Sequence, residues 1–261
     1  AHLETVNFTL LEEFGEIKQK KVIDFNDYQN FLKKNGIMLN HVEREYRHRF
    51  SIHETTKIRQ CSPTKKEEAW KYTSLNSLLK PDYSVYSNKE RNVELKNVRK
   101  YFLHEIDTYK LVFVDGVYSA FLSETTHDKV DVCLLSSALS KPKYKPVIEA
   151  YFNKAAKKDS LTSLNTAFAK EGAYIYIPKH REVEKPIEII NFATGSEAAL
   201  MVQPRNLVVV GENAHVQIIE RHQSLSSNAV LTNSVTEIFA EKRAIVDYYK
   251  IQNDVSTASL I

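Results

Sequence analysis

A strand–turn–strand unit occurs twice near the end of this chain, and it constrains the fold more than any other feature. The first copy, residues 206–222, reads NLVVVGENAHVQIIERH, and the second, residues 236–252, reads TEIFAEKRAIVDYYKIQ. At a shift of thirty residues the copies match in type, as in Val208 with Ile238, Ala214 with Ala244, Val216 with Val246, and Ile218 with Tyr248. A unit that buries only one face gains stability by stacking on its copies, so the repeat predicts stacked β-structure.

The spacing alone leaves two topologies open. The turns GENA and EKRA could close antiparallel hairpins of a sandwich, or they could form bends between rungs of a parallel β-solenoid. Repetition at about thirty residues favours the solenoid. Segments rich in Val, Ile and Tyr, with turn residues between them, are predicted as strands. They are 173–177, 186–192, 206–210, 215–220, 234–240 and 245–251.

The chain before residue 170 has a different pattern. Segments with apolar residues at helical spacing are 8–17, 24–36, 146–158 and 160–169. Within 109–122, two apolar runs flank Asp115-Gly116, which is a strong two-residue hairpin signal. We therefore expect a mostly helical N-terminal domain with a small hairpin over residues 1–170, and a β core over residues 171–261.

Composition bounds the class of protein. The chain has 261 residues, 43% of them hydrophobic and 26% charged, which is ordinary for a globular protein. A net charge of +3 is too small to require a nucleic-acid partner. The two cysteines, Cys61 and Cys133, are expected to be free thiols in a reducing cytosol. No apolar run approaches the roughly 20 residues of a membrane helix, and the N-terminus does not resemble a secretory signal. A cytoplasmic location follows as the expectation.

The sequence contains none of the common catalytic motifs. GxxxxGK[ST], GxGxxG, GxSxG, HExxH and CxxC are all missing, so we expect a protein that is not an enzyme and that has no phosphate-binding loop of its own. One alternative is a carbohydrate-active β-solenoid enzyme that uses Glu220 with Glu237 or Asp247 as paired carboxylates. Lateral pairing of the two copies argues against it, because it places Lys250 opposite Glu220.

A second alternative is a nucleic-acid-binding protein. Its basis is a cluster of lysines, at positions Lys141, Lys143, Lys145, Lys154, Lys157 and Lys158. The aromatic residues of the same segment, Tyr144, Tyr151 and Phe152, fit the spacing of a helical core equally well.

Two histidines lie in the second strand of the first copy. His215 and His222 are seven positions apart, so they should point to opposite faces and cannot share one metal ion. Glu220 and His222 should share a face, which makes them the metal candidates of this sequence. A structural, hydrogen-bonding role is the alternative, because no cysteine accompanies them.

Two roles are possible for each of the other polar and aromatic candidates. Trp70 and Tyr72 could anchor a partner or could pack the helical domain onto the β core. Arg205, Asn206 and Gln252 could form a hydrogen-bonded ladder that fixes strand register, or they could line a polar path for a ligand.

Five separated motifs together resemble one known family. In order they are KEEAWKYT (66–73), LNTAFAKEGAYIYIPK (164–179), VEKPIEI (183–189), QPRNLVVVGENAHVQIIERH (203–222) and VDYYKIQN (246–253). This order resembles the SufB/SufD family of the SUF iron–sulfur cluster assembly system, SufD-type members more closely than SufB-type ones. The resemblance covers roughly residues 64–261.

The resemblance implies a fold and a function. The implied fold is mainly β, a right-handed parallel β-helix between an N-terminal and a C-terminal helical domain. The implied function is a non-enzymatic scaffold that pairs with a SufB-type subunit and a SufC-type ATPase. Iron or an iron–sulfur cluster would be held only in the assembled complex, with no intrinsic cofactor, no nucleic acid and no membrane.

The resemblance also implies that the chain is truncated. The C-terminal helical domain is expected to be absent, and with it the surfaces for SufB and SufC. The open β end at the C-terminus is expected to allow a homodimer.

Overall fold

The computed structural model describes residues 70–72, 75, 81, 83, 93–124, 130–155, 160–169, 171–194, 199–225, 227–255 and 258–260. The helices predicted over 8–17 and 24–36, and Cys61, lie outside the described residues.

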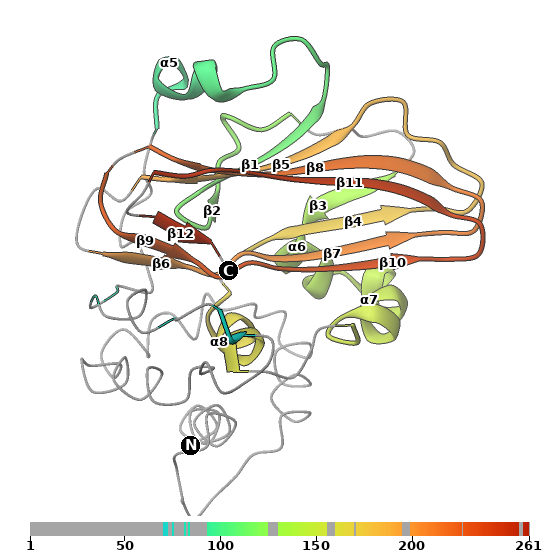
Figure 1. Ribbon diagram of the computed structural model, residues 1–261. Coiled ribbons are helices and arrows are strands. Elements are labelled where there is room, and N and C mark those ends of the chain that lie inside the picture. The colour runs from blue at the N-terminus through green and yellow to red at the C-terminus, as the bar shows by residue number, and fades with distance from the viewer. Residues whose placement is uncertain are drawn as a thin grey trace, which may run out of the picture.

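The largest sheet has five strands in the order β11–β8–β5–β1–β2 (Figure 1). These strands are β1 (Tyr109–Val114), β2 (Val117–Tyr118), β5 (Ile187–Ala193), β8 (His215–Ser224) and β11 (Ile245–Asn253). The predicted hairpin is confirmed, since β1 and β2 pair antiparallel around Asp115-Gly116, with Phe113 opposite Tyr118.

The described residues form two further sheets. The second has the order β10–β7–β4–β3, and the third has the order β12–β9–β6. Their strands are β3 (Asp131–Leu134), β4 (Ala173–Ile177), β6 (Leu200–Val202), β7 (Arg205–Val210), β9 (Val230–Thr232), β10 (Val235–Ala240) and β12 (Ala258–Leu260). The short strands β6, β9 and β12 were not expected from the sequence.

The thirty-residue repeat is confirmed by strand pairing. Strand β10 pairs in parallel with β7, with Val208 opposite Ile238, and β11 pairs in parallel with β8, with Val216 opposite Val246. The turn GENA joins β7 to β8, which belong to different sheets. The alternative in which these turns close sandwich hairpins is therefore wrong.

The prediction of a mainly β fold that forms a right-handed parallel β-helix is wrong. The described residues form a mixed α/β fold, in which the two larger sheets are themselves mixed. The Asp115-Gly116 turn reverses the chain, so β2 runs antiparallel to β1, and β3 runs antiparallel to β4. Helical segments lie between β3 and β4 along the chain. The sequence repeat gave no information about these helices or about the antiparallel strands.

Short helices cover the outer faces of the two larger sheets. They are α5 (Leu95–Val98), η2 (Arg99–Tyr101), α6 (Leu135–Ser140), η3 (Pro142–Tyr144), α7 (Lys145–Tyr151) and α8 (Ser160–Phe168). Leu135, Tyr144 and Ile148 pack against Tyr174 and Leu207 of the four-stranded sheet. Around α5, Val98 packs on the outer side of β1 and β5.

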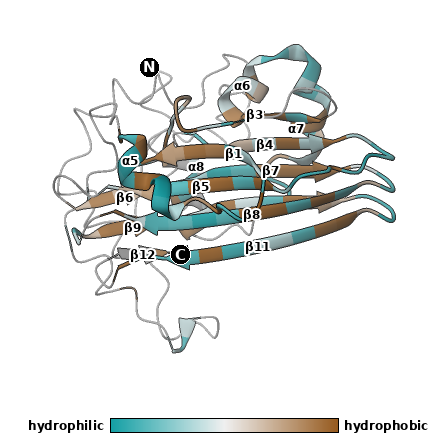
Figure 2. Ribbon diagram, turned by 90° about the horizontal axis from the view of Figure 1, so that it is seen from above, coloured by the Kyte–Doolittle hydropathy of each residue, from teal (hydrophilic) through white to brown (hydrophobic). Residues whose placement is uncertain are grey.

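The main apolar core lies between the five-stranded and four-stranded sheets. Its residues alternate along each strand, as the period of two requires, with Ile187 and Ile189 of β5 facing Ile175 and Val208. Burial of such side chains is the main stabilising contribution. Figure 2 shows the contrast between hydrophobic inner strands such as β1 and β4 and the more hydrophilic β11.

The predicted domain boundary near residue 170 stays a prediction. Strands from before it pair with strands from after it, since Tyr109 of β1 lies opposite Ile187 and Leu134 of β3 opposite Ala173. The two parts are also joined at Gly172, whose carbonyl oxygen accepts the backbone N–H of Leu135 at 2.8 Å. Among the described helices, none is long and apolar enough to cross a membrane.

Candidate functional site

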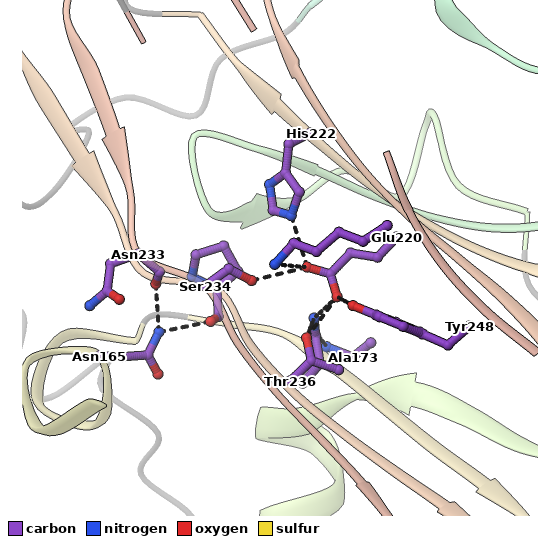
Figure 3. A network of polar contacts seen from close by, with 11 residues as sticks. Asn165, Ala173, Glu220, His222, Asn233, Ser234, Thr236 and Tyr248 are labelled. Atoms are coloured by element: carbon purple, nitrogen blue, oxygen red, sulfur yellow. Dashed lines mark hydrogen bonds and ion pairs between the residues drawn. The ribbon is translucent and has the colours of Figure 1, made fainter. Parts of the chain in front are cut away.

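Glu220 is the centre of a buried polar cluster between the sheets (Figure 3). It lies on β8 and faces inward, although most of its inward neighbours on that strand are apolar. Its carboxylate receives donors from four strands and one connecting residue. These are His222 Nε2 at 2.8 Å and Ser234 Oγ at 3.0 Å on Oε1, Thr236 Oγ1 and Tyr248 Oη at 2.7 Å each on Oε2, Asn206 Nδ2 at 3.4 Å, and the ammonium of Lys250 at 3.6 Å.

The environment of Glu220 keeps it ionised. Burial by itself raises the pKa of a carboxyl group, but the hydrogen bond from His222, the charge of Lys250 and the hydrogen bond from Thr236 outweigh that effect on Glu220. The pKa of Glu220 is therefore held well below its usual range. The cost of burying this charge is offset by donors that hold it in one geometry.

His222 lies two residues further along the same face, as the spacing predicts. Its Nε2 donates to Glu220, while its Nδ1 has no hydrogen-bond partner among the described residues. His215 lies on the opposite face, 3.1 Å from Asp247 and 3.8 Å from Glu182. The hydrogen bond from His215 lowers the pKa of Asp247. The two histidines therefore do not share a ligand.

The described residues contain no group of three or more His, Cys, Asp or Glu side chains that could hold a metal ion. Glu220 and His222 are close together, but they bind each other. Cys133 lies half-buried on β3, and burial raises the pKa of its thiol.

Asn206 joins three strands near this cluster. Its Oδ1 accepts from the backbone N–H of Ala173 on β4 at 2.9 Å, and its Nδ2 donates to Thr236 Oγ1 on β10 at 3.0 Å. Since Asn206 itself lies on β7, the side chain links neighbouring strands at one register position. Gln252, the third of the predicted polar residues, is exposed on β11 and lies opposite His222.

Arg205 is buried on the other face of β7, away from Glu220. Its guanidinium lies 2.7 Å from Glu237 and 3.0 Å from Asn153, with the ring of Phe152 at 5.3 Å. Glu237 also accepts the backbone N–H groups of Asn153 and Ala155. Burial lowers the pKa of Arg205, and the charge of Glu237 opposes that shift. This ion pair fixes the segment after α7 onto β7 and β10.

Helix α8 is held by hydrogen bonds beside Arg205, at the residues that precede β7 and β10. Asn165 Nδ2 donates to the carbonyl oxygens of Pro204 and Asn233 at 2.8 Å each, and Asn165 Oδ1 lies 3.4 Å from Arg205. Asn233 donates in turn to Gln203, thirty residues earlier. The sequence reasoning missed Asn165 and Asn233, although aligning Gln203 with Asn233 in the repeat would have indicated a ladder.

The predicted aromatic pair lies apart from these clusters. Trp70 is half-buried, and Tyr72 is 89% exposed with Lys71 over its ring. Tyr72 is therefore available at the surface.

The carboxylates of the carbohydrate-enzyme alternative do not face each other. Glu220 points inward, Glu237 is paired with Arg205 on the other side of the sheet, and Asp247 pairs with His215. Lys250 lies opposite Glu220, as the repeat predicts.

The lysine cluster of the nucleic-acid alternative is partly neutralised. Lys143 pairs with Asp131 at 2.8 Å and Lys145 lies 3.9 Å from Glu149, while Tyr144 is buried against Tyr174.

Comparison with protein families gives the class to which this arrangement belongs. A family model described as "SufBD protein N-terminal region" matches residues 20–189. A second, described as "SUF system FeS cluster assembly, SufBD core domain", matches residues 192–261. The chain belongs to the SufBD family of SUF-system proteins.

Individual relatives are more distant. A protein of Synechocystis described as an iron–sulfur cluster assembly SufBD family protein, slr0076, is 28% identical over 74% of this chain and 44% of its own length. The iron–sulfur cluster assembly protein SufD of Bacillus subtilis is 27% identical over 41% of this chain and 25% of its own length. A chloroplastic SufBD family protein of Arabidopsis thaliana, ABCI8, is 28% identical over 54% of this chain and 26% of its own length. The chain spans less than half the length of each.

Proposed function

We propose that this chain is part of a scaffold subunit of an iron–sulfur cluster assembly complex. In this proposal it is a SufD-type subunit that acts with a SufB-type partner and a SufC-type ATPase in cluster building and iron acquisition. The observation that carries the proposal is the pair of SufBD family matches, which together cover residues 20–189 and 192–261. The likeness to the B. subtilis protein named SufD supports the SufD type.

The Glu220 cluster supports a scaffold rather than an enzyme. A general base or nucleophile needs an atom that can reach the substrate, whereas both oxygens of Glu220 are taken by protein donors. The sequence also has no phosphate-binding motif, so ATP use belongs to the ATPase partner in this proposal. In this proposal iron or a cluster is cargo of the complex, held only once the complex is assembled, and the chain has no intrinsic cofactor.

The remaining expectations are kept as part of the same proposal. The protein acts in the cytoplasm, without nucleic acid or membrane. The pairing of Lys143 and Lys145 with acidic neighbours supports the first exclusion, because those charges are already balanced.

Co-purification tests the proposal. The full-length protein would be tagged, produced together with a SufB-type subunit and a SufC-type ATPase, and isolated without oxygen. We expect the three subunits to elute together in a fixed ratio. Isolation of the tagged protein alone, under conditions where the other two associate with each other, would contradict the proposal.

A pair of surface variants gives a matched control. Tyr72 and Phe121 are both exposed aromatic residues, at 89% and 78%. Exposed aromatic residues that anchor partners lose affinity on truncation. We expect Tyr72→Ser to lower partner recovery and Phe121→Ser to leave it unchanged, with both variants folded by circular dichroism.

A further inference from the structure

A column of side chains crosses the five-stranded sheet at one register position. Asn191 of β5 lies opposite His222 of β8, and His222 lies opposite Gln252 of β11. On the other side of Asn191, Phe113 of β1 occupies the same position. Asn191 has the parity of Ile187 and Ile189, and His222 has the parity of Val216 and Ile218, so both face the core between the sheets.

Two polar atoms of this column have no hydrogen-bond partner in the described part of the chain. They are Asn191 Nδ2 and His222 Nδ1. Asn191 is 8% exposed and His222 is 3% exposed, so bulk water does not reach them freely. In Figure 3 the ring of His222 is linked to Glu220 through one nitrogen, while its other nitrogen is unlinked. Buried polar groups in folded proteins nearly always have partners, and ordered water supplies many of them.

The two atoms need complementary partners. Because His222 Nε2 donates to the carboxylate of Glu220, a neutral ring presents Nδ1 as an acceptor. The amide Nδ2 of Asn191 is a donor. Adjacent strands lie about 4.8 Å apart, which places both side chains within reach of one small molecule.

A metal ion fits this position poorly. The ammonium of Lys250 lies 3.6 Å from the carboxylate that would have to support the imidazole. Among the described residues, His222 belongs to no group of three or more His, Cys, Asp or Glu side chains that could hold a metal ion. A water molecule fits, because it can accept from Asn191 and donate to His222 at the same time.

We propose that a buried water molecule bridges Asn191 Nδ2 and His222 Nδ1 and fixes His222 as the neutral tautomer protonated on Nε2. The water completes a hydrogen-bonded chain that runs from β5 through His222 to Glu220, and from there to Thr236 of β10 and Tyr248 of β11. His222 is then a structural link between strands. The proposal does not depend on the function proposed above.

Nitrogen NMR of the imidazole rings tests the tautomer directly. The full-length protein, labelled with 15N-histidine, would be examined at pH 7 by long-range proton–nitrogen correlation. We expect the His222 ring to show a protonated Nε2 and an unprotonated Nδ1. A His222 ring protonated on Nδ1, alone or together with Nε2, would overturn the proposal.

An Asn191→Asp variant replaces the donor Nδ2 near His222 Nδ1 by an acceptor oxygen. A carboxylate in place of the amide supplies an acceptor to Nδ1, so we expect the His222 ring to become protonated on both nitrogens at pH 7. Asn213→Asp is the matched control, because Asn213 Nδ2 lies 3.3 Å from His180 Nδ1 on an exposed turn. It should leave the His222 signals unchanged, and a change in them as large as that from Asn191→Asp would count against the bridge.

Two measurements on the unmodified protein keep the proposal testable if the variant does not fold. A crystal structure at high resolution should show density within hydrogen-bonding distance of both atoms, and clear absence of density there would refute the bridge. Addition of one equivalent of Zn²⁺ should leave the His222 Nδ1 signal in place. Loss of the His222 Nδ1 signal, while the ring signals of His180 are retained as a reference, would show that Nδ1 binds metal instead.

Discussion

The two copies of the repeated unit have the same strand register and opposite surroundings. Every residue of β7 is buried, whereas in β10 only Glu237 is. Strand β8 lies between β5 and β11 and is mostly buried, while β11 is the outermost described strand of its sheet and is mostly exposed. The difference arises from the number of neighbouring strands, because the local sequence patterns are alike.

The inward side chains of the second copy complete the first. Tyr248 and Lys250 of β11 lie opposite Ile218 and Glu220 of β8, and both reach the carboxylate of Glu220. The repeat thus sets the backbone pairing, while the side chains at matched positions have diverged to serve different neighbours. Substitutions at matched or contrasting positions can test how far this difference extends.

The largest expected effect is at Arg205. Arg205→Met removes the cation and leaves the buried carboxylate of Glu237 without its charged partner. Breaking one partner of a buried pair costs about 3–5 kcal/mol, which urea unfolding of the purified protein would measure.

Arg243→Met is the control for an exposed position. Arg243 pairs with Glu212 at 2.7 Å, but the two side chains are 59% and 37% exposed. Exposed pairs contribute about 0–1 kcal/mol. Equal losses of unfolding free energy in Arg205→Met and Arg243→Met would show that burial does not determine how much an ion pair contributes to stability in this protein.

The sequence predicted what is local and missed what depends on distant contacts. Alternation with a period of two and the turns GENA and EKRA predicted the strands β4, β5, β7, β8, β10 and β11, because these signals lie within a few residues. The strands β6, β9 and β12 have three residues each, too few to show a period.

The pairing of strands far apart in the chain was beyond such reasoning. Tyr109 pairs with Ile187, 78 residues away, and no pattern within either strand indicates that partner. The site divides in the same way. The shared face of Glu220 and His222 follows from their spacing. The donors Ser234, Thr236 and Tyr248 come from other parts of the chain and are brought together only by folding.

The second expected effect is at Glu220. Glu220→Gln replaces one acceptor oxygen by a donor that faces other buried donors, which costs about 2–3 kcal/mol near neutral pH. The pKa of Glu220 is lower in the folded state than the usual value of about 4.3 in the unfolded chain. Its contribution to stability is therefore complete above that pH and is lost as the pH falls below it. The difference between wild type and variant should shrink from pH 6 to pH 3.

Lys250→Gln is the matched change in the second copy. Lys250 lies opposite Glu220 but is partly exposed, so its removal should cost less than about 1 kcal/mol. If the difference in unfolding free energy between the wild type and Glu220→Gln stayed constant down to pH 3, that result would contradict the low pKa of the Glu220 carboxyl group.

The third effect compares the same residue type in both copies. Val216 and Val246 lie opposite each other, and Val216 is fully buried whereas Val246 is half-buried. Val216→Ala should cost about 2 kcal/mol through lost burial and a residual cavity, and Val246→Ala about half of that or less. Equal costs in denaturant unfolding would break the comparison, because they would mean that β11 is as enclosed in solution as β8.

The smallest effect is on the outer face of β8, at His215. Its hydrogen bond, and to a lesser degree that of Gln217, lowers the pKa of the exposed Asp247. His215→Gln should raise the pKa of Asp247 toward its usual value, which carboxyl-carbon NMR titration would measure, while the urea midpoint stays within error because the pair is open to water. His222→Gln, on the inner face of the same strand, should lower the midpoint clearly. If His215→Gln lowered the urea midpoint as much as His222→Gln, the outer face of β8 would have to be covered in solution. The contrast between enclosed and open positions would then hold between β8 and β11, but not between the two faces of β8.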